Sequence, residues 1–402
     1  MLAAMPIPSP TEKLPEALQP WQDAIVQAGR AGQCIQVRGM GSKAHVGHPA
    51  QGEWLDTTAW QGVVSYEPSE LVLTARAGTS LHDIEALLTT QGQSLAFEPP
   101  RLTLSGVGAG TLGGMVAAGL SGPARAMRGA VRDHVLGVRM LNGQGQYLRF
   151  GGTVMKNVAG FDLSRLMAGS MGTLGVLTDV TLKVLPQPVA TETLHGHMDL
   201  AQAIRLLNLW AAQPLPLDAS CWHQGQLWLR LRGARAAVDA ARSVLAHTSV
   251  EGVETRLTPW SQDADGFWQS LRDQQHAFFM APDERALWRL SLPSTQAPGL
   301  PDMPAWSDND ALVEWMGAQR WWRTSAPAAQ VMAAAQAAGG HATLWRAAPG
   351  DDEHAVRQQV AQLAWQHWPT VMQQWHRQVQ LAFDPLGVFD TGRLWPRRTP
   401  QA

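Results

Sequence analysis

Alternation of apolar and polar residues marks most of the expected elements in the first half of the chain. Leu81, Ile84 and Leu88 instead recur at helical spacing, behind a Thr-Ser pair that can cap the helix. Asn142-Gly143 lies between two apolar runs and is a strong hairpin signal. We expect a helix at 20–29 and a second that carries Leu81, Ile84, Leu87 and Leu88 on one face, strands at 34–38, 54–56, 63–66, 71–77, 95–97 and 176–185, and a hairpin over 135–152.

The second half alternates strand-like and helix-like segments. Pro369 interrupts a long helical stretch near the end, and Asp384-Pro385 with Gly387 then signals a turn. We expect strands at 191–197, 226–232, 287–293, 319–324 and 341–346, and helices at 199–212, 234–246, 326–337 and 353–382. The fold class is therefore expected to be α+β.

Composition changes near Pro186-Gln187-Pro188. Of the 38 glycines, 26 lie in residues 1–188, whereas 15 of the 18 tryptophans lie in 189–402. Glycine allows positive φ and close backbone approach to a ligand, while tryptophan mainly packs. We expect two domains, 1–188 and 189–402, with the ligand site on the first. We also expect some of the excess tryptophans, around Trp315–Trp322 and Trp365–Trp375, to reach a partner interface.

Charge and cysteine content exclude several classes of function. The chain has 31 Lys+Arg and 33 Asp+Glu, so it offers no electrostatic reason to bind nucleic acid. Its two cysteines, Cys34 and Cys221, provide neither a disulfide framework nor a cluster-binding set. No signal peptide or transmembrane run is recognisable, so we expect a cytoplasmic protein that meets the inner face of the membrane only through partners.

Two glycine-dense segments are the main candidates for chemistry. Arg38-Gly39-Met40-Gly41-Ser42 follows a predicted strand, and a second segment runs from Gly106 to Gly122. Successive backbone N–H groups in such turns bind anions, and Ser42 and Lys43 can add donors. A dinucleotide fingerprint of the GxGxxG type is disfavoured, because neither segment joins a strand directly to a helix. Two phosphate-competent loops in one domain suit a ligand with a diphosphate.

These segments and two later ones resemble a known family. Residues 38–42, Thr111-Leu112-Gly113-Gly114, residues 131–137 and residues 169–176 resemble, in order, the FAD-binding domain of the vanillyl-alcohol oxidase / PCMH flavoprotein family. The longer string 149–170 is similar to the FAD-binding E subunits of bacterial glycolate oxidases. The similarity extends to the C-terminal residues 383–389, so it covers nearly the whole chain.

The resemblance implies a PCMH-type domain of two α+β lobes at 1–188. An α+β cap or partner domain at 189–402 would follow, and its C-terminal turn would return to the flavin. Residues 38–43 would hold the pyrophosphate, 111–114 and 117–122 would flank the ribityl chain and flavin, and Gly172, Gly175 and Val176 would line the adenine. The implied set is Arg38, Gly39, Met40, Gly41, Ser42, Lys43, Pro99, Thr111, Leu112, Gly113, Gly114, Ala117, Ala118, Gly119, Gly122, Asp133, Gly172, Gly175 and Val176.

The resemblance implies non-covalent FAD, because Ser42 stands where some relatives carry a flavin-linking His. His45 and His48 are interpreted as solvated surface. Two motifs depart from the family pattern: Asp390-Thr391-Gly392-Arg393 replaces Asn-Pro-Gly-Arg, and Gly340-His341-Ala342-Thr343 replaces His-Gly-Asp-Gly-Asn. The second change removes an acidic ligand, so we expect no metal, and His341 is interpreted as a structural strand residue.

No catalytic residue is identified, although Lys156, Asn157 and Asp162 are polar candidates. The implied function is the FAD-binding subunit of a glycolate oxidase complex. It would oxidise glycolate to glyoxylate beside a homologous flavoprotein subunit and pass electrons to an iron–sulfur subunit. A non-catalytic assembly subunit and a free-standing FAD-dependent 2-hydroxy-acid dehydrogenase are the alternatives.

Overall fold

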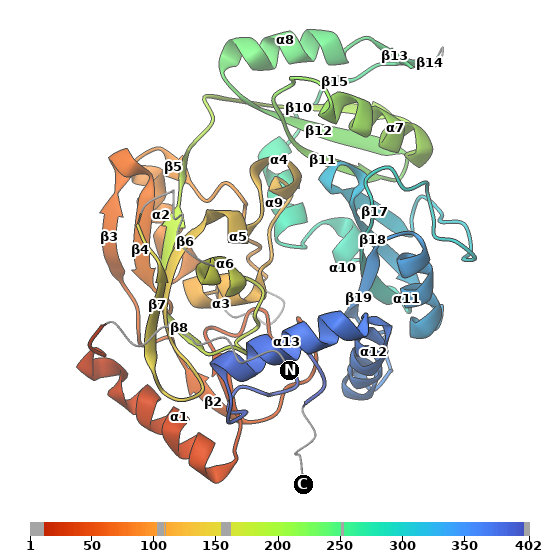
Figure 1. Cartoon of the computed structure of the whole chain (residues 1–402). Helices are drawn as coiled ribbons and strands as arrows, with labels where there is room; N and C mark the ends of the chain where they lie inside the picture. The colour runs from red at the N-terminus through yellow and green to blue at the C-terminus, as the bar shows by residue number, and fades with distance from the viewer. Residues whose placement is uncertain (1–11, 103–107, 109, 154–161, 251–252, 398–402) are drawn as a thin grey trace.

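The computed structural model describes residues 12–102, 108, 110–153, 162–250 and 253–397. Figure 1 shows two bodies of mixed helix and sheet, with the C-terminal helix running back from the second body toward the first. The expected α+β class is confirmed, because helices and largely antiparallel sheets are combined in both halves.

The first half contains a parallel pair of strands and a five-stranded antiparallel sheet of order β3-β4-β8-β6-β7. One face of that sheet packs on α2 and α3 around Leu73, Ile84 and Met115. The elements are η1 (Glu16–Leu18), α1 (Gln19–Ala31), β1 (Ile35–Arg38), β2 (Glu53–Asp56), β3 (Val63–Glu67), η2 (Pro68–Glu70), β4 (Val72–Arg76), α2 (Leu81–Thr90), β5 (Gln93–Ser94), α3 (Leu112–Ala118), α4 (Arg125–Arg128), α5 (Val131–His134), β6 (Val135–Leu141), β7 (Tyr147–Gly151), α6 (Leu163–Leu166), β8 (Val176–Lys183) and β9 (Leu185–Pro186).

The second half is built on an eight-stranded sheet of order β15-β10-β12-β11-β17-β18-β16-β19, whose neighbouring strands are all antiparallel. Helices α7 and α8 pack near one end of it, and α11 and α12 near the other (Figure 1). The elements are β10 (Ala190–His197), α7 (Leu200–Ala211), β11 (Leu217–His223), β12 (Gln226–Gly233), α8 (Arg235–Leu245), β13 (Thr248–Val250), β14 (Val253–Thr255), β15 (Thr258–Pro259), α9 (Ala264–Arg272), α10 (Ala277–Met280), β16 (Ala286–Ser291), β17 (Ala311–Glu314), η3 (Trp315–Gly317), β18 (Gln319–Thr324), α11 (Ala328–Ala337), β19 (His341–Arg346), α12 (Glu353–His367) and α13 (Thr370–Phe383).

Most predicted elements lie where the pattern placed them, with two kinds of error. The strand expected at 95–97 is a turn. Strand pairing in this segment ends before it, since β5 pairs with β9 only through Gln93 and Ser94. Strands β11 and β17 were missed. All seven residues of β11 are buried, including Asp218 and Ser220, so it shows no alternation of polar and apolar positions.

The expectation that Trp315–Trp322 reach a partner surface is wrong. Trp315, Trp321 and Trp322 are 5%, 4% and 3% exposed, and they pack inside the second half and against the first. The indole of Trp315 donates to the carbonyl of Gly122 at 3.0 Å, which satisfies its polar atom within the core. In the second group Trp375 is 49% exposed.

The C-terminal segment returns to the first half. Phe383, at the end of α13, belongs to the core of the five-stranded sheet, and Val388 and Phe389 pack with α1 and β1. The carboxylate of Asp384 accepts hydrogen bonds from the backbone N–H groups of Val388 and Phe389, both at 2.8 Å, and so fixes the turn. In Figure 1, α13 accordingly runs from α12 toward β2 and α1.

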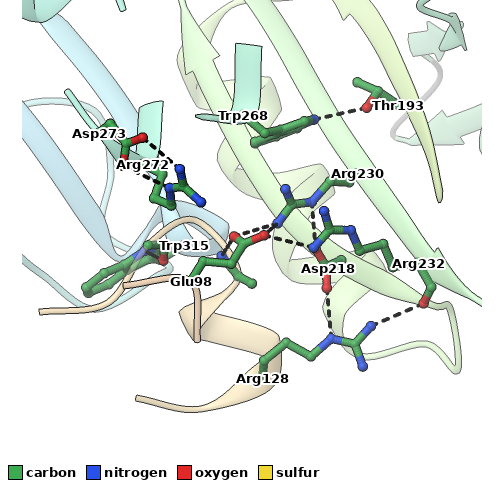
Figure 2. Close-up of polar contacts among 12 residues, drawn as sticks. Glu98, Arg128, Thr193, Asp218, Arg230, Arg232, Trp268, Arg272, Asp273 and Trp315 are labelled. Carbon is green, nitrogen blue, oxygen red and sulfur yellow. Dashed lines mark hydrogen bonds and ion pairs between the residues drawn. The ribbon is translucent and has the colours of Figure 1, made fainter. Parts of the chain in front are cut away.

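A buried cluster of charges joins the two halves (Figure 2). Glu98 of the first half accepts from Arg230 at 2.7 Å and from Arg232 at 2.8 Å, both on β12. Asp218 on β11 accepts from Arg230 at 2.6 Å and from Arg128 of α4 at 2.8 Å. Separating the halves would break the ion pairs of Glu98 with Arg230 and Arg232 and that of Asp218 with Arg128. The cluster therefore holds the halves in one arrangement.

Candidate functional site

A cleft that is open to solvent lies in the first half, between the end of β1, the start of α3 and the loop before β8. Most of the residues predicted for FAD line it. They are Arg38, Gly39, Met40, Gly41, Ser42, Lys43, Thr111, Gly113, Gly114, Ala117, Ala118, Gly172 and Gly175.

The loop of residues 39–43 forms one wall of the cleft. Its five backbone N–H groups donate to no described residue, although Ala44 N–H closes the turn on the carbonyl of Gly41 at 3.0 Å. Gly41 has φ +75°, a conformation that residues with a Cβ rarely adopt. Unpaired N–H groups along a glycine turn are suited to an anion such as a phosphate.

The start of α3 lies directly against this loop. A Cβ on Gly39 would approach the hydroxyl of Thr111 to 2.3 Å, so glycine is needed for the contact. The hydroxyl of Thr111 caps α3 by accepting from the N–H of Gly114 at 3.2 Å. Gly113 N–H donates to the carbonyl of Ala77 at 2.7 Å and ties α3 to the end of β4. The two glycine segments thus meet along one cleft.

Positive charge in the cleft lacks a matching carboxylate. Burial lowers the pKa of Lys43 to about 8, and the charge of Asp273 only partly opposes this effect. The Lys43 amine contacts Ser42 Oγ at 3.3 Å, and none of the ion pairs among described residues includes it. The guanidinium of Arg38 lies 5.0 Å from the ring centre of Trp54. A bound anion would raise the pKa of Lys43 again and keep its amine charged over a wider pH range.

The C-terminal turn completes the cleft. Thr391 and Arg393 line it, and Arg393 Nη2 donates to the carbonyls of Lys43 at 3.0 Å and Ala44 at 2.7 Å. Gly392 has φ +84°, which the glycine retained from the family pattern permits. Burial and the charge of Arg357 lower the pKa of Arg393 to about 10. The altered motif therefore still reaches the cleft and braces the loop after β1.

The wall before β8 depends on two glycines. Gly175 has φ +143°, and a Cβ there would lie 2.4 Å from the carbonyl oxygen of Leu141. Gly172 has φ +76° and faces Val37 across the cleft.

Six residues of the predicted set lie outside the cleft. Leu112 and Val176 are core residues, and Pro99 is also buried. Asp133 accepts from Ala130 N–H at 2.8 Å and fixes the start of α5. The other two, Gly119 and Gly122, follow α3, where Gly119 ends the helix with φ +66° and Gly122 lines a second, smaller cavity.

Several lining residues were not predicted from the sequence. Trp54 is 57% exposed on β2, and a large aromatic at a strand position facing solvent was the available signal. The others lie beside glycines already chosen or come from distant segments. They are Gln36, Val37, Ala44, Ala50, Thr57, Ala77, Ser170, Met171, Leu177, Thr391 and Arg393.

The interpretation of His45 and His48 as solvated surface is wrong. Both are half-buried, and burial together with the charge of Arg357 lowers the pKa of each to about 4. The His45 ring packs on Trp345 at 5.5 Å between centres. No group of His, Cys, Asp and Glu that could hold a metal occurs among the described residues.

The remaining polar candidates show structural roles or lie outside the described residues. Asp162 caps α6 by accepting from Arg165 N–H at 3.3 Å, and it pairs with the same residue's guanidinium. His341 begins β19 with an exposed side chain, and its pKa is lowered by desolvation and by Arg289. Lys156 and Asn157 lie outside the described residues.

Comparison with known proteins agrees with this geometry. A family model described as an FAD binding domain matches residues 14–151. Glycolate oxidase subunit GlcE of Escherichia coli (strain K12) is 44% identical over 361 residues, covering 90% of this chain and 92% of that protein. Glycolate oxidase subunit GlcD of Bacillus subtilis (strain 168) is 30% identical over 157 residues, covering 38% of this chain and 32% of that protein.

Two further similarities are weaker. D-lactate dehydrogenase of Anaerostipes hadrus is 31% identical over 137 residues, covering 34% of this chain and 28% of that protein. A solved structure of alkyldihydroxyacetonephosphate synthase superposes with a TM-score of 0.58 at 13% identity, covering 93% of this chain and 75% of that chain. Together with the domain match, this likeness confirms the predicted FAD-binding fold. None of the described helices is long and apolar enough to cross a membrane.

Proposed function

This chain belongs to the family of glycolate oxidase GlcE subunits, and we propose that its cleft holds FAD for the oxidation of glycolate to glyoxylate. It is an FAD-dependent oxidoreductase subunit of the class that acts on 2-hydroxy acids. The observation that supports the cofactor best is the cleft wall of residues 39–43, whose five N–H groups find no described acceptor beside the uncompensated Lys43.

The donor set fits the diphosphate of FAD. The N–H groups of residues 39–43 and the Lys43 amine would bind the phosphate oxygens, while Arg393 would hold the loop in place through its bonds to Lys43 and Ala44. Gly113, Gly114, Ala117 and Ala118 would leave room for the flavin end. Bound FAD would supply a two-electron acceptor for the C–H bond of the hydroxy acid.

Attachment of the cofactor is proposed to be non-covalent. Ser42 occupies the loop position at which a linking histidine would be needed. The nearest histidine, His45, packs its ring on Trp345 of the second half.

We further propose the division into an FAD-binding domain at 1–188 and a second domain at 189–402. The five-stranded sheet is supplied by residues 63–183 and the eight-stranded sheet by residues 190–346. The segment after Phe383 belongs by sequence to the second domain and by packing to the first.

Electron exit is proposed to use another chain. The chain has two cysteines, Cys34 and Cys221, whereas an iron–sulfur cluster usually takes four thiolates. A homologous flavoprotein subunit, for which the GlcD similarity is the support, and an iron–sulfur subunit would complete a cytoplasmic complex. Any contact with the inner face of the membrane would then be made by those partners.

The visible spectrum of the purified chain tests the proposal. A flavin spectrum whose chromophore is released by acid is expected. Gly41→Ala should weaken FAD binding by about tenfold, because a Cβ at φ +75° costs about 1–2 kcal/mol and would lie 3.0 Å from the Arg38 guanidinium.

Gly152→Ala is the matched control, because no atom lies within 4 Å of a Cβ added there. A colourless wild-type chain that takes up no added FAD would contradict the proposed function and favour an assembly role.

A further inference from the structure

A second, narrow cavity lies between the two halves, beside the FAD cleft. The same stretch of chain borders both spaces: Ala117 and Ala118 line the cleft, while Leu120, Gly122 and Pro123 line the cavity. A small molecule in the cavity would therefore lie within a few residues of the wall proposed to hold the flavin.

Arg289 of β16 presents to this cavity a guanidinium whose charge is only partly offset by nearby Glu314. Its Nε donates to Gln319 Oε1 at 2.7 Å, while its two terminal nitrogens donate to no described residue. It forms no ion pair with a described carboxylate, and it is flanked by the rings of Trp315 and Trp321, at 5.2 Å and 5.9 Å. Burial and the charge of Arg125 lower its pKa to about 10. By contrast, Arg272 in the same wall is paired with Asp273 at 2.7 Å.

Glu314 lies at the end of β17 in the same wall. Its Oε2 accepts from Trp321 Nε1 at 2.7 Å and from Gln319 Nε2 at 3.1 Å. Its Oε1 accepts from no described residue. Gln319 thus bridges Arg289 and Glu314, so that a guanidinium edge and a carboxyl oxygen are both left available toward one space.

The backbone after Glu314 is strained. Trp315 and Met316 have φ values of +55° and +56°, and Gly317 follows at +96°. A left-handed conformation in a bulky residue costs about 1–3 kcal/mol and persists where the surroundings enforce it, often beside a functional site. Here the Trp315 indole donates to the carbonyl of Gly122, and its ring lies against the Arg289 guanidinium at 5.2 Å.

The rest of the wall limits what can enter. Apolar surfaces from Pro100, Leu102, Leu120, Leu271, Trp321 and Trp345 surround the polar pair. A largely apolar wall in which Arg289 is the guanidinium without an ion-pair partner favours a compact anion, and a planar carboxylate matches the fork of an arginine. A polyanion would leave its further charges unpaired against the apolar wall.

We propose that this cavity binds a small 2-hydroxy carboxylate, with Arg289 pairing with the carboxylate and Glu314 Oε1 accepting a hydrogen bond from the hydroxyl. The choice of a 2-hydroxy acid rests on the proposed function, whereas the preference for a carboxylate rests on Arg289 itself. This chain would then carry its own substrate pocket in addition to any pocket in a partner.

Calorimetric titration of the purified chain with glycolate tests the site by direct binding. Saturable binding is expected for glycolate and none for ethylene glycol, which has a similar size but lacks the carboxylate. Arg289→Gln should weaken glycolate binding by about 10-fold to 100-fold, the range expected for hydrogen bonds to charged groups. Arg205→Gln, an exposed arginine on α7, is the matched control and should bind as wild type does.

If Arg289→Gln fails to fold by thermal melting, Arg289→Lys provides the second test, since it keeps a cation but loses the planar fork. It should bind glycolate more weakly than wild type. Equal affinity in a folded Arg289 variant and wild type, or no saturable glycolate binding to an FAD-loaded chain, overturns the site. An FAD-free chain that binds glycolate through Arg289 supports the site while the proposed function fails.

Discussion

Replacing Glu314 by glutamine should stabilise the protein at about pH 8 and have little effect at about pH 5. Glu314 is 3% exposed, and burial raises its pKa from 4.5 to about 7 despite hydrogen bonds from Trp321 and Gln319. Glutamine keeps a carbonyl oxygen at the position of Oε2, which accepts both of those bonds. The substitution therefore removes the ionisation while preserving the local contacts.

The sign and size follow from the two pKa values. Between 4.5 and about 7 the folded chain keeps a proton on Glu314 that the unfolded chain has released, so stability falls as pH rises through this window. Each pKa unit corresponds to about 1.36 kcal/mol, so the shift destabilises the folded state by about 3 kcal/mol once Glu314 is ionised in both the folded and the unfolded chain. Between about pH 5 and pH 8 the loss is roughly 2.5 kcal/mol.

Urea unfolding followed by tryptophan fluorescence, at both pH values, measures the effect. The informative quantity is the variant-minus-wild-type difference in free energy of unfolding, because other titrating groups cancel in it. Glu70→Gln, at an exposed carboxylate that forms no side-chain hydrogen bond or ion pair with a described residue, serves as the control and should show no change. A Glu314→Gln difference that is the same at both pH values would refute the reasoning.

Two further predictions concern the cleft and the partner surface. Lys43→Gln should weaken FAD binding at about pH 7. In the wild type, affinity should fall above about pH 8, the pKa of Lys43 in the FAD-free chain, because the amine then loses the charge that pairs with phosphate, and the variant should not show this fall. Flavin fluorescence titrations at about pH 7 and pH 9 check this, and identical pH dependence in both proteins would contradict it. Trp375→Ser, at an exposed position of α13, should reduce co-purification with the homologous flavoprotein subunit at unchanged FAD content, whereas Val189→Ser should not. Retention of the partner by the Trp375 variant would move the interface elsewhere.

The cleft was largely predictable because its requirements are local. Gly41 and Gly175 adopt positive φ, and Gly39 allows the Thr111 hydroxyl to approach. Both requirements select glycine at the position itself, so the glycines in the sequence indicate where the backbone is closely approached. By contrast, Arg393 reaches the cleft only because Asp384 fixes a turn more than 300 residues away from the first glycine loop. No local pattern encodes such a return, which was implied by the family resemblance alone.

Errors in the second half have a different cause. In β11, Asp218 occupies a fully buried position because Arg230 and Arg128 neutralise it from other elements. A reading of polarity along the chain treats such a residue as exposed, so the strand is lost. The prediction for the tryptophans was wrong in the opposite sense, because it placed buried residues at a surface. Trp315 and Trp321 were assigned to an interface since aromatic content alone does not distinguish a core from a docking surface.

Contacts from both halves fix the position at which the cleft and the second cavity meet. On one side, Gly113 N–H donates to the carbonyl of Ala77, the residue after β4. On the other, Glu98 is held by Arg230 and Arg232, and Arg101 N–H donates to Asp273 at 2.9 Å. Sliding one half past the other would break a buried charge cluster and these backbone contacts together. The distance between the two spaces is therefore set by packing, and a ligand in the cavity and a cofactor in the cleft would meet in a preformed arrangement.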